Sequence, residues 1–548
     1  PRRSYAGRVG LQRPQGSFNR LLHRGLARLA LPAGEGSAVI FDLERVAWHC
    51  AVLPAARRFG NRRSLGYGAA TLLEGRCALG LSDIADSLTR SVENLASGFS
   101  ETFFEPVVRL GVTGLSRSGK TVFITSLVAN LLDRGRMPAL RAEAEGRILS
   151  AFLQPQPDDT IARFDYEAHL AAMTGPAPRW PDSTRSISEL RLSFRVQTGG
   201  ILGPFRGPRV LHLDIVDYPG EWLLDLALLE KSYDDWSEET LTRIAARPEA
   251  AEFMSLVVRM DPSERMNEPV ALELALTFAA YLKAARAAGY SDCTPGRFLL
   301  PGDLAGSPVL TFAPLPAAVA ARTSLRREME RRYEAYKARV VKPFFRDHFA
   351  KVDRQVVLVD ALGAIHAGPK AVEDLRLAMA DILAAFRPGP QSWLGGLLGA
   401  KRVGRILFAA TKADHLHHEQ HARLTAIMAA MMREAKDRAD FAGADTAAMS
   451  IAGLRATVEE EVRHNGADLP MVRGTLMSTG RQAAFWPGEL PADPSRLLTP
   501  AREGAEGWLD GDYGVMVFAP AKVRLRPGEG PPHIRLDRAV EFLIGDRL

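Results

Sequence analysis

The segment Gly114–Thr121, GLSRSGKT, most constrains what this chain can fold into. It matches the pattern G-x-x-x-x-G-K-[S/T] and lies between an apolar, β-rich run, Val107–Thr113, and an apolar helical pattern, Lys120–Leu132. The glycines let the backbone form a concave loop whose N–H groups point inward, and the following helix directs its positive N-terminal end at the same place. The sequence therefore predicts a strand–loop–helix unit that holds the phosphates of a nucleotide.

Within this loop, each residue type has an expected role. Lys120 is expected to reach the β- and γ-phosphates and to act in catalysis, and the Thr121 hydroxyl is expected to ligate Mg²⁺. An ordinary glycine-rich turn between a strand and a helix is the alternative. The residues expected to contact the nucleotide here are Gly114, Ser116, Arg117, Ser118, Gly119, Lys120, Thr121 and Val122.

A second motif is LHLDIVDYPG, Leu211–Gly220, in which a hydrophobic strand runs into a D-x-x-G pattern. In enzymes that carry such a phosphate-binding loop, this carboxylate helps to hold the metal and the glycine N–H senses the γ-phosphate. Asp217 and Gly220 are therefore predicted site residues, with Asp217 as a metal ligand. Asp214 in the same strand is the competing carboxylate, and D-x-x-G by itself is most often only a turn.

A third motif, TKAD at Thr411–Asp414, follows the apolar run Arg405–Ala410. The Asp414 carboxylate can accept hydrogen bonds from the N1–H and the amine of guanine, and the stem of Lys412 can pack on the base; adenine lacks that pair of donors. The alternative is a solvated loop, because His415, His417 and His418 read as surface residues, and a metal site there is disfavoured for want of a partner group. Further expected base contacts come from Thr411, Ser450 and Ile451.

Between the first two motifs, Thr184 in WPDSTRSISELRL is the candidate switch residue, able to bind Mg²⁺ and the γ-phosphate. Arg185 beside it is the candidate for neutralising charge in the transition state. A loop that merely leads into the next strand is the alternative for both residues.

The order of β-like and helical patterns predicts an α/β fold with a mostly parallel sheet. Expected strands after the first are Ser188–Val196, Arg209–Val216, Gln355–Val359, Arg405–Ala410 and Ala447–Ile451. The long interval between the third and fourth strands reads as helices, such as Glu268–Ala287 and Leu325–Phe349. The expected division is an extension at 1–80, a core at 81–221 and 352–455, a helical insertion domain at 222–351, and a smaller α+β segment at 456–548.

Composition excludes several classes of protein. Hydrophobic residues make up 46% and charged residues 24% of the 548 residues, which is typical of a globular chain. No apolar run reaches the roughly 18 residues of a membrane span, no leader is recognisable, and the three cysteines, Cys50, Cys77 and Cys293, form no metal-binding pair, so a cytoplasmic location is expected.

Charge is concentrated at one end of the chain. Residues 1–80 hold 13 Arg, no Lys and four acidic residues, a balance of +9, so the rest carries −3 of the net +6 and nucleic acid is not an expected partner. The basic segment is expected to be disordered or not native, and the alternative is an arm that binds an anionic membrane or nucleic acid. Ser82 begins a predicted helix with an apolar stripe from Ile84 to Phe99, expected to be a core face or, alternatively, a peripheral contact with the inner membrane.

With these motifs assembled, the chain resembles the YcjX-like family of bacterial P-loop GTPases across about residues 81–548. The resemblance is carried by Arg109–Val128, Trp180–Leu192, Asp217–Leu226 (DYPGEWLLDL), Phe408–Leu416 and His533–Leu548. It implies a Ras-like P-loop NTPase core that binds GTP and GDP with Mg²⁺. It also implies a stress-associated protein with ties to the phage-shock envelope response.

One residue departs from the better-known Ras-like pattern. Glu221 stands where a Gln often orients the attacking water, and a carboxylate beside a γ-phosphate is unfavourable unless it is turned away or protonated. The leading prediction is therefore slow intrinsic GTP hydrolysis, with the attacking water positioned by another residue or by a protein partner or activator. The alternatives are an interaction protein with negligible turnover, or an ATPase.

Overall fold

The computed structural model describes residues 105–115, 117–182, 186–197, 207–319, 321–384, 403–441, 443–464, 466–505 and 517–548. The expectations for segment 1–80, for the helix that begins at Ser82 and for the site residues Ser116, Thr184 and Arg185 fall outside these residues. In the described part of the chain, no helix is both long enough and apolar enough to cross a membrane.

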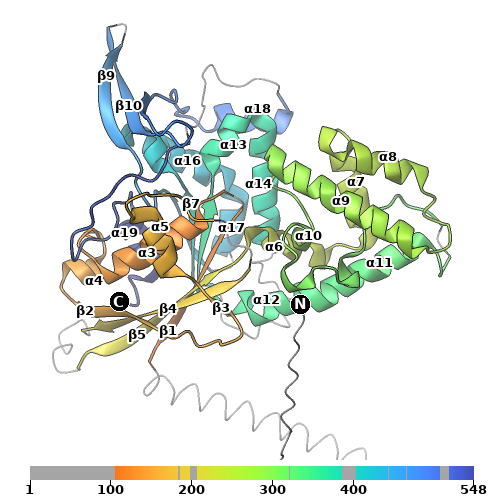
Figure 1. Cartoon of the computed structure of the whole chain (residues 1–548), viewed down its shortest axis with the longest axis horizontal. Helices are drawn as coiled ribbons and strands as arrows, with labels where there is room; N and C mark the ends of the chain where they lie inside the picture. Colours follow the sequence, from red (N-terminus) through yellow and green to blue (C-terminus); the bar gives the residue numbers. More distant parts are fainter. Residues whose placement is uncertain are drawn as a thin grey trace, which may run out of the picture. The chain divides into compact units, whose positions relative to one another are not determined.

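An eight-stranded sheet forms the centre of the described chain, with the order β2-β4-β5-β1-β6-β7-β8 and β3 beside β4 (Figure 1). Strands β5, β1, β6, β7 and β8 run parallel to one another, whereas β4 is antiparallel to β5 and β2 is antiparallel to β4. The α/β prediction with a mostly parallel sheet is thus confirmed. The strands are β1 (Val107–Gly114), β2 (Ile148–Gln154), β3 (Ala162–Arg163), β4 (Ser188–Val196), β5 (Arg209–Asp217), β6 (Arg354–Val359), β7 (Arg405–Ala410) and β8 (Asp445–Ser450).

One face of the sheet is covered by α3 (Lys120–Leu132), α5 (Tyr166–Thr174) and α19 (Leu536–Ile544). Side chains alternate between faces along a strand, so Val108, Leu110 and Val112 of β1 all reach this apolar layer. Helix α3 has the bounds that the sequence predicts, and the closing helix α19 begins one residue later than Arg535. The short helix α4 (Arg141–Ala144) follows α3 in the chain.

The opposite face packs against helices from two parts of the chain in one continuous apolar core. Between β5 and β6 these are α6 (Gly220–Leu224), α7 (Tyr233–Ile244), α8 (Ala251–Arg259), α9 (Glu268–Ala288), α10 (Gly296–Leu299), α11 (Leu325–Tyr336) and α12 (Lys342–Asp347). After β6 come α13 (Ala361–Ala367), α14 (Pro369–Ala384), α16 (His421–Met431), α17 (Arg433–Phe441) and α18 (Ser495–Glu503). Because the helices of the interval share a core with the sheet, their division as a separate domain at 222–351 stays a prediction.

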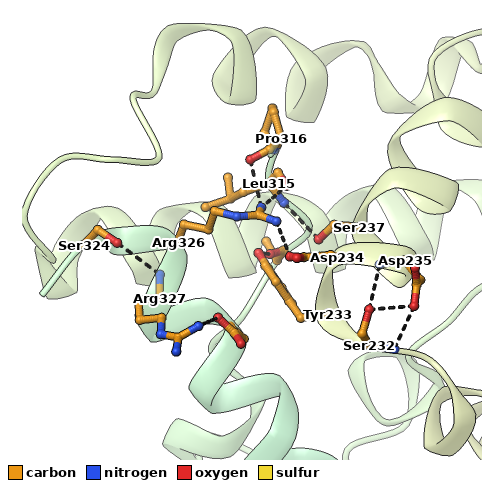
Figure 2. Close-up of polar contacts among 12 residues, drawn as sticks. Ser232, Tyr233, Asp234, Asp235, Ser237, Leu315, Pro316, Ser324, Arg326 and Arg327 are labelled. Atoms are coloured by element: carbon orange, nitrogen blue, oxygen red, sulfur yellow. Dashed lines mark hydrogen bonds and ion pairs between the residues drawn. The ribbon is translucent and has the colours of Figure 1, made fainter. Parts of the chain in front are cut away.

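Polar contacts join the helices of this interval to one another (Figure 2). Ser232 caps α7, its hydroxyl accepting the Asp235 N–H at 3.1 Å. The guanidinium of Arg326 on α11 donates to the Leu315 carbonyl at 2.7 Å and forms an ion pair with Asp234 of α7. These bonds satisfy a buried charge with two acceptors, as a buried guanidinium requires.

The predicted helix Leu325–Phe349 is helical over Leu325–Asp347, with an irregular turn in its middle. Helix α11 ends at Tyr336 and is followed by one wider, π-type turn, Lys337–Val341, before α12 begins. Pro343 at the start of α12 has no N–H to donate to the turn before it, which disrupts the regular i to i−4 ladder at this point.

The C-terminal part contains a separate three-stranded antiparallel sheet, in the order β11-β10-β9. Its strands are β9 (Val458–His464), β10 (Ala467–Thr475) and β11 (Gln482–Phe485). With α18 and α19, this confirms the prediction of a smaller α+β segment after the parallel sheet.

Candidate functional site

The three sequence motifs meet at one edge of the sheet. Gly114 and Asp217 are the last residues of β1 and β5, and Ala410 and Ser450 are the last residues of β7 and β8. Their strands are parallel, with Val112 paired to Asp217 and Ala410 paired to Ser450. The carboxyl ends of parallel strands form the usual ligand-binding edge of an open α/β sheet.

The glycine loop after β1 has the backbone of an anion-binding nest. Arg117 and Gly119 both adopt left-handed conformations, with φ of 66° and 79°, and α3 begins at the next residue, Lys120. The Ser118 N–H donates to the Leu115 carbonyl at 3.2 Å and closes the turn. A β-carbon at position 119 would meet no atom within 4 Å, so the backbone there stays accessible to a ligand.

Two polar side chains of the loop mark where an anion would bind. The Lys120 ammonium donates to the Gly114 carbonyl at 3.2 Å, across the mouth of the loop. The Ser118 hydroxyl is buried and has no hydrogen-bond partner among the described residues. Thr121 is buried in the first turn of α3, Val122 is half-buried and Arg117 is exposed. A cation at the mouth and an unsatisfied hydroxyl inside it fit a phosphate group.

The second motif touches the first directly. Gly220 is the first residue of α6, and a β-carbon built on it would lie 2.0 Å from the carbonyl oxygen of Gly114. Lys120 and Gly220 therefore both contact the same carbonyl. Asp217, three residues before Gly220, is buried at the end of β5.

Asp214 does not share this position. Its two carboxylate oxygens accept from the Arg191 guanidinium at 2.6 and 2.8 Å, and it is fully buried in the middle of the sheet. Because side chains alternate along a strand, Asp214 and Asp217 point to opposite faces of the sheet. The structure therefore places only Asp217 on the same face as α3.

Glu221 is engaged away from the loop. Its carboxylate pairs with the Arg286 guanidinium of α9 at 2.7 Å, and its side chain is 6% exposed. The sequence predicted that a carboxylate at this position would be unfavourable unless it were turned away from the phosphates. The ion pair with Arg286 directs the carboxylate toward α9 and gives it an opposite charge there.

Aromatic residues of the same segment, which the sequence did not single out as functional, anchor it to the helical interval. The ring of Tyr218 meets the edge of Phe344 of α12 at a centroid separation of 5.8 Å. The Arg297 guanidinium lies 3.2 Å from the centroid of the Trp222 ring. The aromatic residues near the end of the helical interval, such as Phe344, were the sequence signal that could have indicated these contacts. The D-x-x-G segment thus has one end at the phosphate loop and the other among these helices.

The third motif forms a compact turn after β7. Lys412 has a left-handed backbone, with φ of 60°, and its ammonium forms an ion pair with Asp360. The buried Asp414 carboxylate accepts the Ala456 N–H at 2.9 Å. Asp360, directly after β6, also caps α13 by accepting the Gly363 N–H at 3.0 Å. The sequence did not identify Asp360, although its place directly after an apolar strand was a usable signal.

The backbone near Ser450 is already bonded within the fold. The Ser450 N–H donates to the Thr425 hydroxyl at 3.0 Å, and the Ile451 N–H donates to the Ala410 carbonyl at 2.8 Å. The Ile451 carbonyl accepts the Ala413 N–H at 3.0 Å, which ties this segment to the third motif. A direct contact of Ser450 or Ile451 with a base stays a prediction.

Comparison with known proteins places this arrangement in a family. A protein of Escherichia coli (strain K12) named "Ras-like GTPase YcjX" is 38% identical over 456 residues, which cover 80% of this chain and 96% of that protein. A protein of the same name from Shewanella oneidensis is 36% identical over 468 residues, covering 80% of this chain and 94% of the relative. The sequence profile of the YcjX-like family, DUF463, matches residues 108–548. The chain, with its mostly parallel Ras-like sheet, therefore belongs to the YcjX-like family.

Proposed function

We propose that this protein binds GTP and GDP at the sheet edge where its three motifs meet, and that it hydrolyses GTP slowly. The observation that supports this most directly is the contact of both Lys120 and Gly220 with the Gly114 carbonyl, because it brings two phosphate-binding motifs to one point. Two relatives are named as GTPases, and they align with four-fifths of this chain.

For the triphosphate, the loop supplies N–H donors and one mobile cation. The left-handed residues Arg117 and Gly119 turn successive N–H groups toward a common centre, and the helix dipole of α3 adds to their potential. The Lys120 ammonium exchanges its bond with the Gly114 carbonyl for bonds to the β- and γ-phosphates. The Ser118 hydroxyl gains an acceptor that it lacks among the described residues.

The residues around the loop fit a magnesium ion. Thr121 and Asp217 offer a hydroxyl and a carboxylate, the hard oxygen ligands that Mg²⁺ prefers, at the start of α3 and the end of β5. Thr184 is proposed as a further ligand. When held by these residues, the ion would supply positive charge that offsets the charge developing on the phosphates.

Guanine recognition is assigned to the turn at Thr411–Asp414. The Ala456 N–H and the ion pair of Lys412 with Asp360 fix the turn before any ligand binds. A preorganised Asp414 carboxylate can accept from guanine N1–H and its amine, while adenine offers no such pair of donors. Thr411 shapes the turn through its bonds to Val359, and Ser450 and Ile451 complete the base-side wall.

Slow turnover follows from the position of Glu221. Its pairing with Arg286 removes the one side chain next to Gly220 that could orient a water molecule. Arg185 is proposed to stabilise transition-state charge, assisted by a protein activator. The Gly220 N–H senses the γ-phosphate, and the aromatic contacts of Tyr218 pass its movement to the helical interval.

The wider role rests on the resemblance alone. We assign the protein to the bacterial envelope stress response, as a cytoplasmic switch that meets the inner membrane peripherally. A deletion strain under envelope stress should show a growth or membrane-potential defect that wild-type protein restores and the Lys120→Ala variant does not. Restoration by the variant would contradict a nucleotide-dependent role.

The test of nucleotide binding uses full-length protein and fluorescent mant-GTP, mant-GDP and mant-ADP. Lys120→Ala should weaken guanine nucleotide binding at least about tenfold, because one charge-assisted contact contributes about 1.5–3 kcal/mol. The matched control is Lys283→Ala on the exposed face of α9, which should bind like wild type. Unchanged affinity in Lys120→Ala would overturn the assignment, and preference for mant-ADP would favour an ATPase.

Phosphate release separates a slow enzyme from an interaction protein without turnover. Single-turnover assays with and without Mg²⁺ should give slow, Mg²⁺-dependent release that Lys120→Ala abolishes. Binding without any release above the Lys120→Ala background would favour the interaction protein.

A further inference from the structure

A cluster of histidines lies directly after the third motif, and the structure gives it the partner group that the sequence did not reveal. His417 and His418 border the short helical turn His418–Gln420, and Glu459 reaches them from β9. The expectation that these histidines lie on a solvated surface is wrong for His417, which is buried, although His418 is 65% exposed on its side chain.

Three potential ligand atoms converge in this cluster. The Glu459 Oε2 atom lies 2.7 Å from His418 Nδ1 and 3.8 Å from His417 Nε2. One atom from each of the three residues lies within 4.8 Å of the other two. Two ligands that are each about 2.1 Å from a tetrahedral ion stand about 3.4 Å apart, so these separations require only small movements to hold one.

The Glu459 carboxylate is oriented by a second residue. Arg455 donates to its Oε1 atom at 3.0 Å, which leaves Oε2 directed at the two imidazoles. Burial disfavours the charged form, but His418 and Arg455 outweigh it and lower the pKa of the Glu459 carboxyl below its ordinary value.

His417 has no role in the hydrogen bonding of this cluster that would explain its place. At 3.8 Å its Nε2 atom is too far from Glu459 for a hydrogen bond. Its Nδ1 atom is buried and has no hydrogen-bond partner among the described residues, lying 3.7 Å from a Glu419 oxygen. Two imidazoles therefore face one carboxylate oxygen, and only the imidazole of His418 is close enough to bond to it.

We propose that His417, His418 and Glu459 bind one transition-metal cation of the Zn²⁺ type, with water in the fourth position. Two imidazoles and a carboxylate are the ligands that Zn²⁺ and its neighbours Ni²⁺ and Co²⁺ accept, whereas Mg²⁺ prefers oxygen ligands only. A Glu419 oxygen lies 3.7 Å from the second nitrogen of His417, and a small movement would let it accept from that nitrogen and support a metal-bound imidazole.

This site is separate from the nucleotide site and does not depend on the proposed function. It adjoins the third motif, because the Thr457 hydroxyl donates to the Asp414 carbonyl, two residues from Glu459. An ion here would cross-link the segment after β7 to the first strand of the C-terminal sheet. Because it binds only the folded chain, the ion raises the free energy of unfolding.

The test titrates Zn²⁺ alone into untagged full-length protein that has been stripped with a chelator, in buffer with excess Mg²⁺. Calorimetry should show one Zn²⁺ per chain, and the melting temperature should rise on Zn²⁺ addition. His418→Gln and Glu459→Gln should each weaken this affinity at least about tenfold, since removing a ligand costs no less than removing its support.

The matched control is His366→Gln, an exposed histidine on α13, which should bind Zn²⁺ like wild type. His418 is mostly exposed, so its variant should keep the wild-type melting temperature without metal. Absence of Zn²⁺ binding by wild type would overturn the site. Equal Zn²⁺ affinity in the double variant His418→Gln/Glu459→Gln would do so too, because the metal would then bind elsewhere.

Discussion

The α-carbon of Gly220 rests against the carbonyl of Gly114, so closely that a β-carbon at position 220 would stand 2.0 Å from that oxygen. The two glycines come from motifs on neighbouring strands of the sheet. Their contact leaves no room between the phosphate loop and the start of α6. A shift of the phosphate loop therefore requires a shift of the start of α6, and the reverse also holds.

Gly220→Ala should destabilise the protein and weaken GTP binding. The clash is with backbone rather than with a flexible side chain, so α6 or the loop must move, at a cost of about 1–3 kcal/mol. Guanidinium chloride unfolding measures the loss of stability, and mant-GTP titration the loss of affinity. Gly207→Ala, where a β-carbon meets open space, should change stability by less than about 0.5 kcal/mol. Equal behaviour of the two variants would contradict the contact.

Asp414→Asn should reduce the preference for guanine over adenine nucleotides. The amide oxygen of Asn can still accept the Ala456 N–H, so the turn keeps its shape. Its NH₂ group, however, opposes the donors of guanine and removes about 1–3 kcal/mol of discrimination. Competition between mant-GDP and ADP measures the ratio. An unchanged ratio would show that the base is recognised by another residue.

Glu221→Gln should lower stability without slowing GTP hydrolysis. It replaces the ion pair with Arg286 by a neutral contact, at a cost of about 1–3 kcal/mol after allowance for the partial exposure of that arginine. A water-orienting or basic residue would instead contribute about 10²-fold or more to the rate. Unfolding curves and single-turnover rates distinguish the two roles. A hundredfold slower variant with unchanged stability would make Glu221 catalytic.

Stability should also depend on pH through Asp225. Burial raises the pKa of this carboxyl from 3.8 to about 6, against the opposing bonds from Tyr336 at 2.5 Å and the Gly296 N–H at 2.7 Å. A raised pKa in the folded state means that the stabilising contribution is complete below about pH 4 and is lost as the pH rises through about 6. Relative to Asp225→Asn, wild type should lose on the order of 2 kcal/mol between pH 4 and 7.

The control for this titration is Tyr336→Phe, which removes a donor but keeps the ring. Without that donor the charged form of Asp225 is less favoured, so the variant should be more destabilised at pH 7.5 than at pH 4.5. Urea unfolding at both pH values measures this. A pH-independent effect would show that Asp225 does not titrate in the folded protein over this range.

Local sequence patterns predicted helices and strands well where neighbouring residues alone determine the backbone conformation. Helix α3 has its predicted bounds, and strand β4 runs over Ser188–Val196 as the alternation of the sequence indicated. The helix predicted for Leu325–Phe349 is helical as far as Asp347, although a π-type turn at Lys337–Val341 interrupts its regular hydrogen bonds just before Pro343. The prediction that His417 lies on the surface was wrong. Burial depends on which segments distant in the sequence pack over a residue, and the local pattern does not show this.

By itself, the sequence determined that the chain forms a strand, a glycine loop and a helix around Gly114–Thr121, because left-handed turns and helix starts depend on residues a few positions apart. Only the tertiary structure decided that Glu459 meets His418 across 41 residues, and that Glu221 meets Arg286. The strength of such contacts depends on distance in space, and the order of strands in the sheet sets those distances.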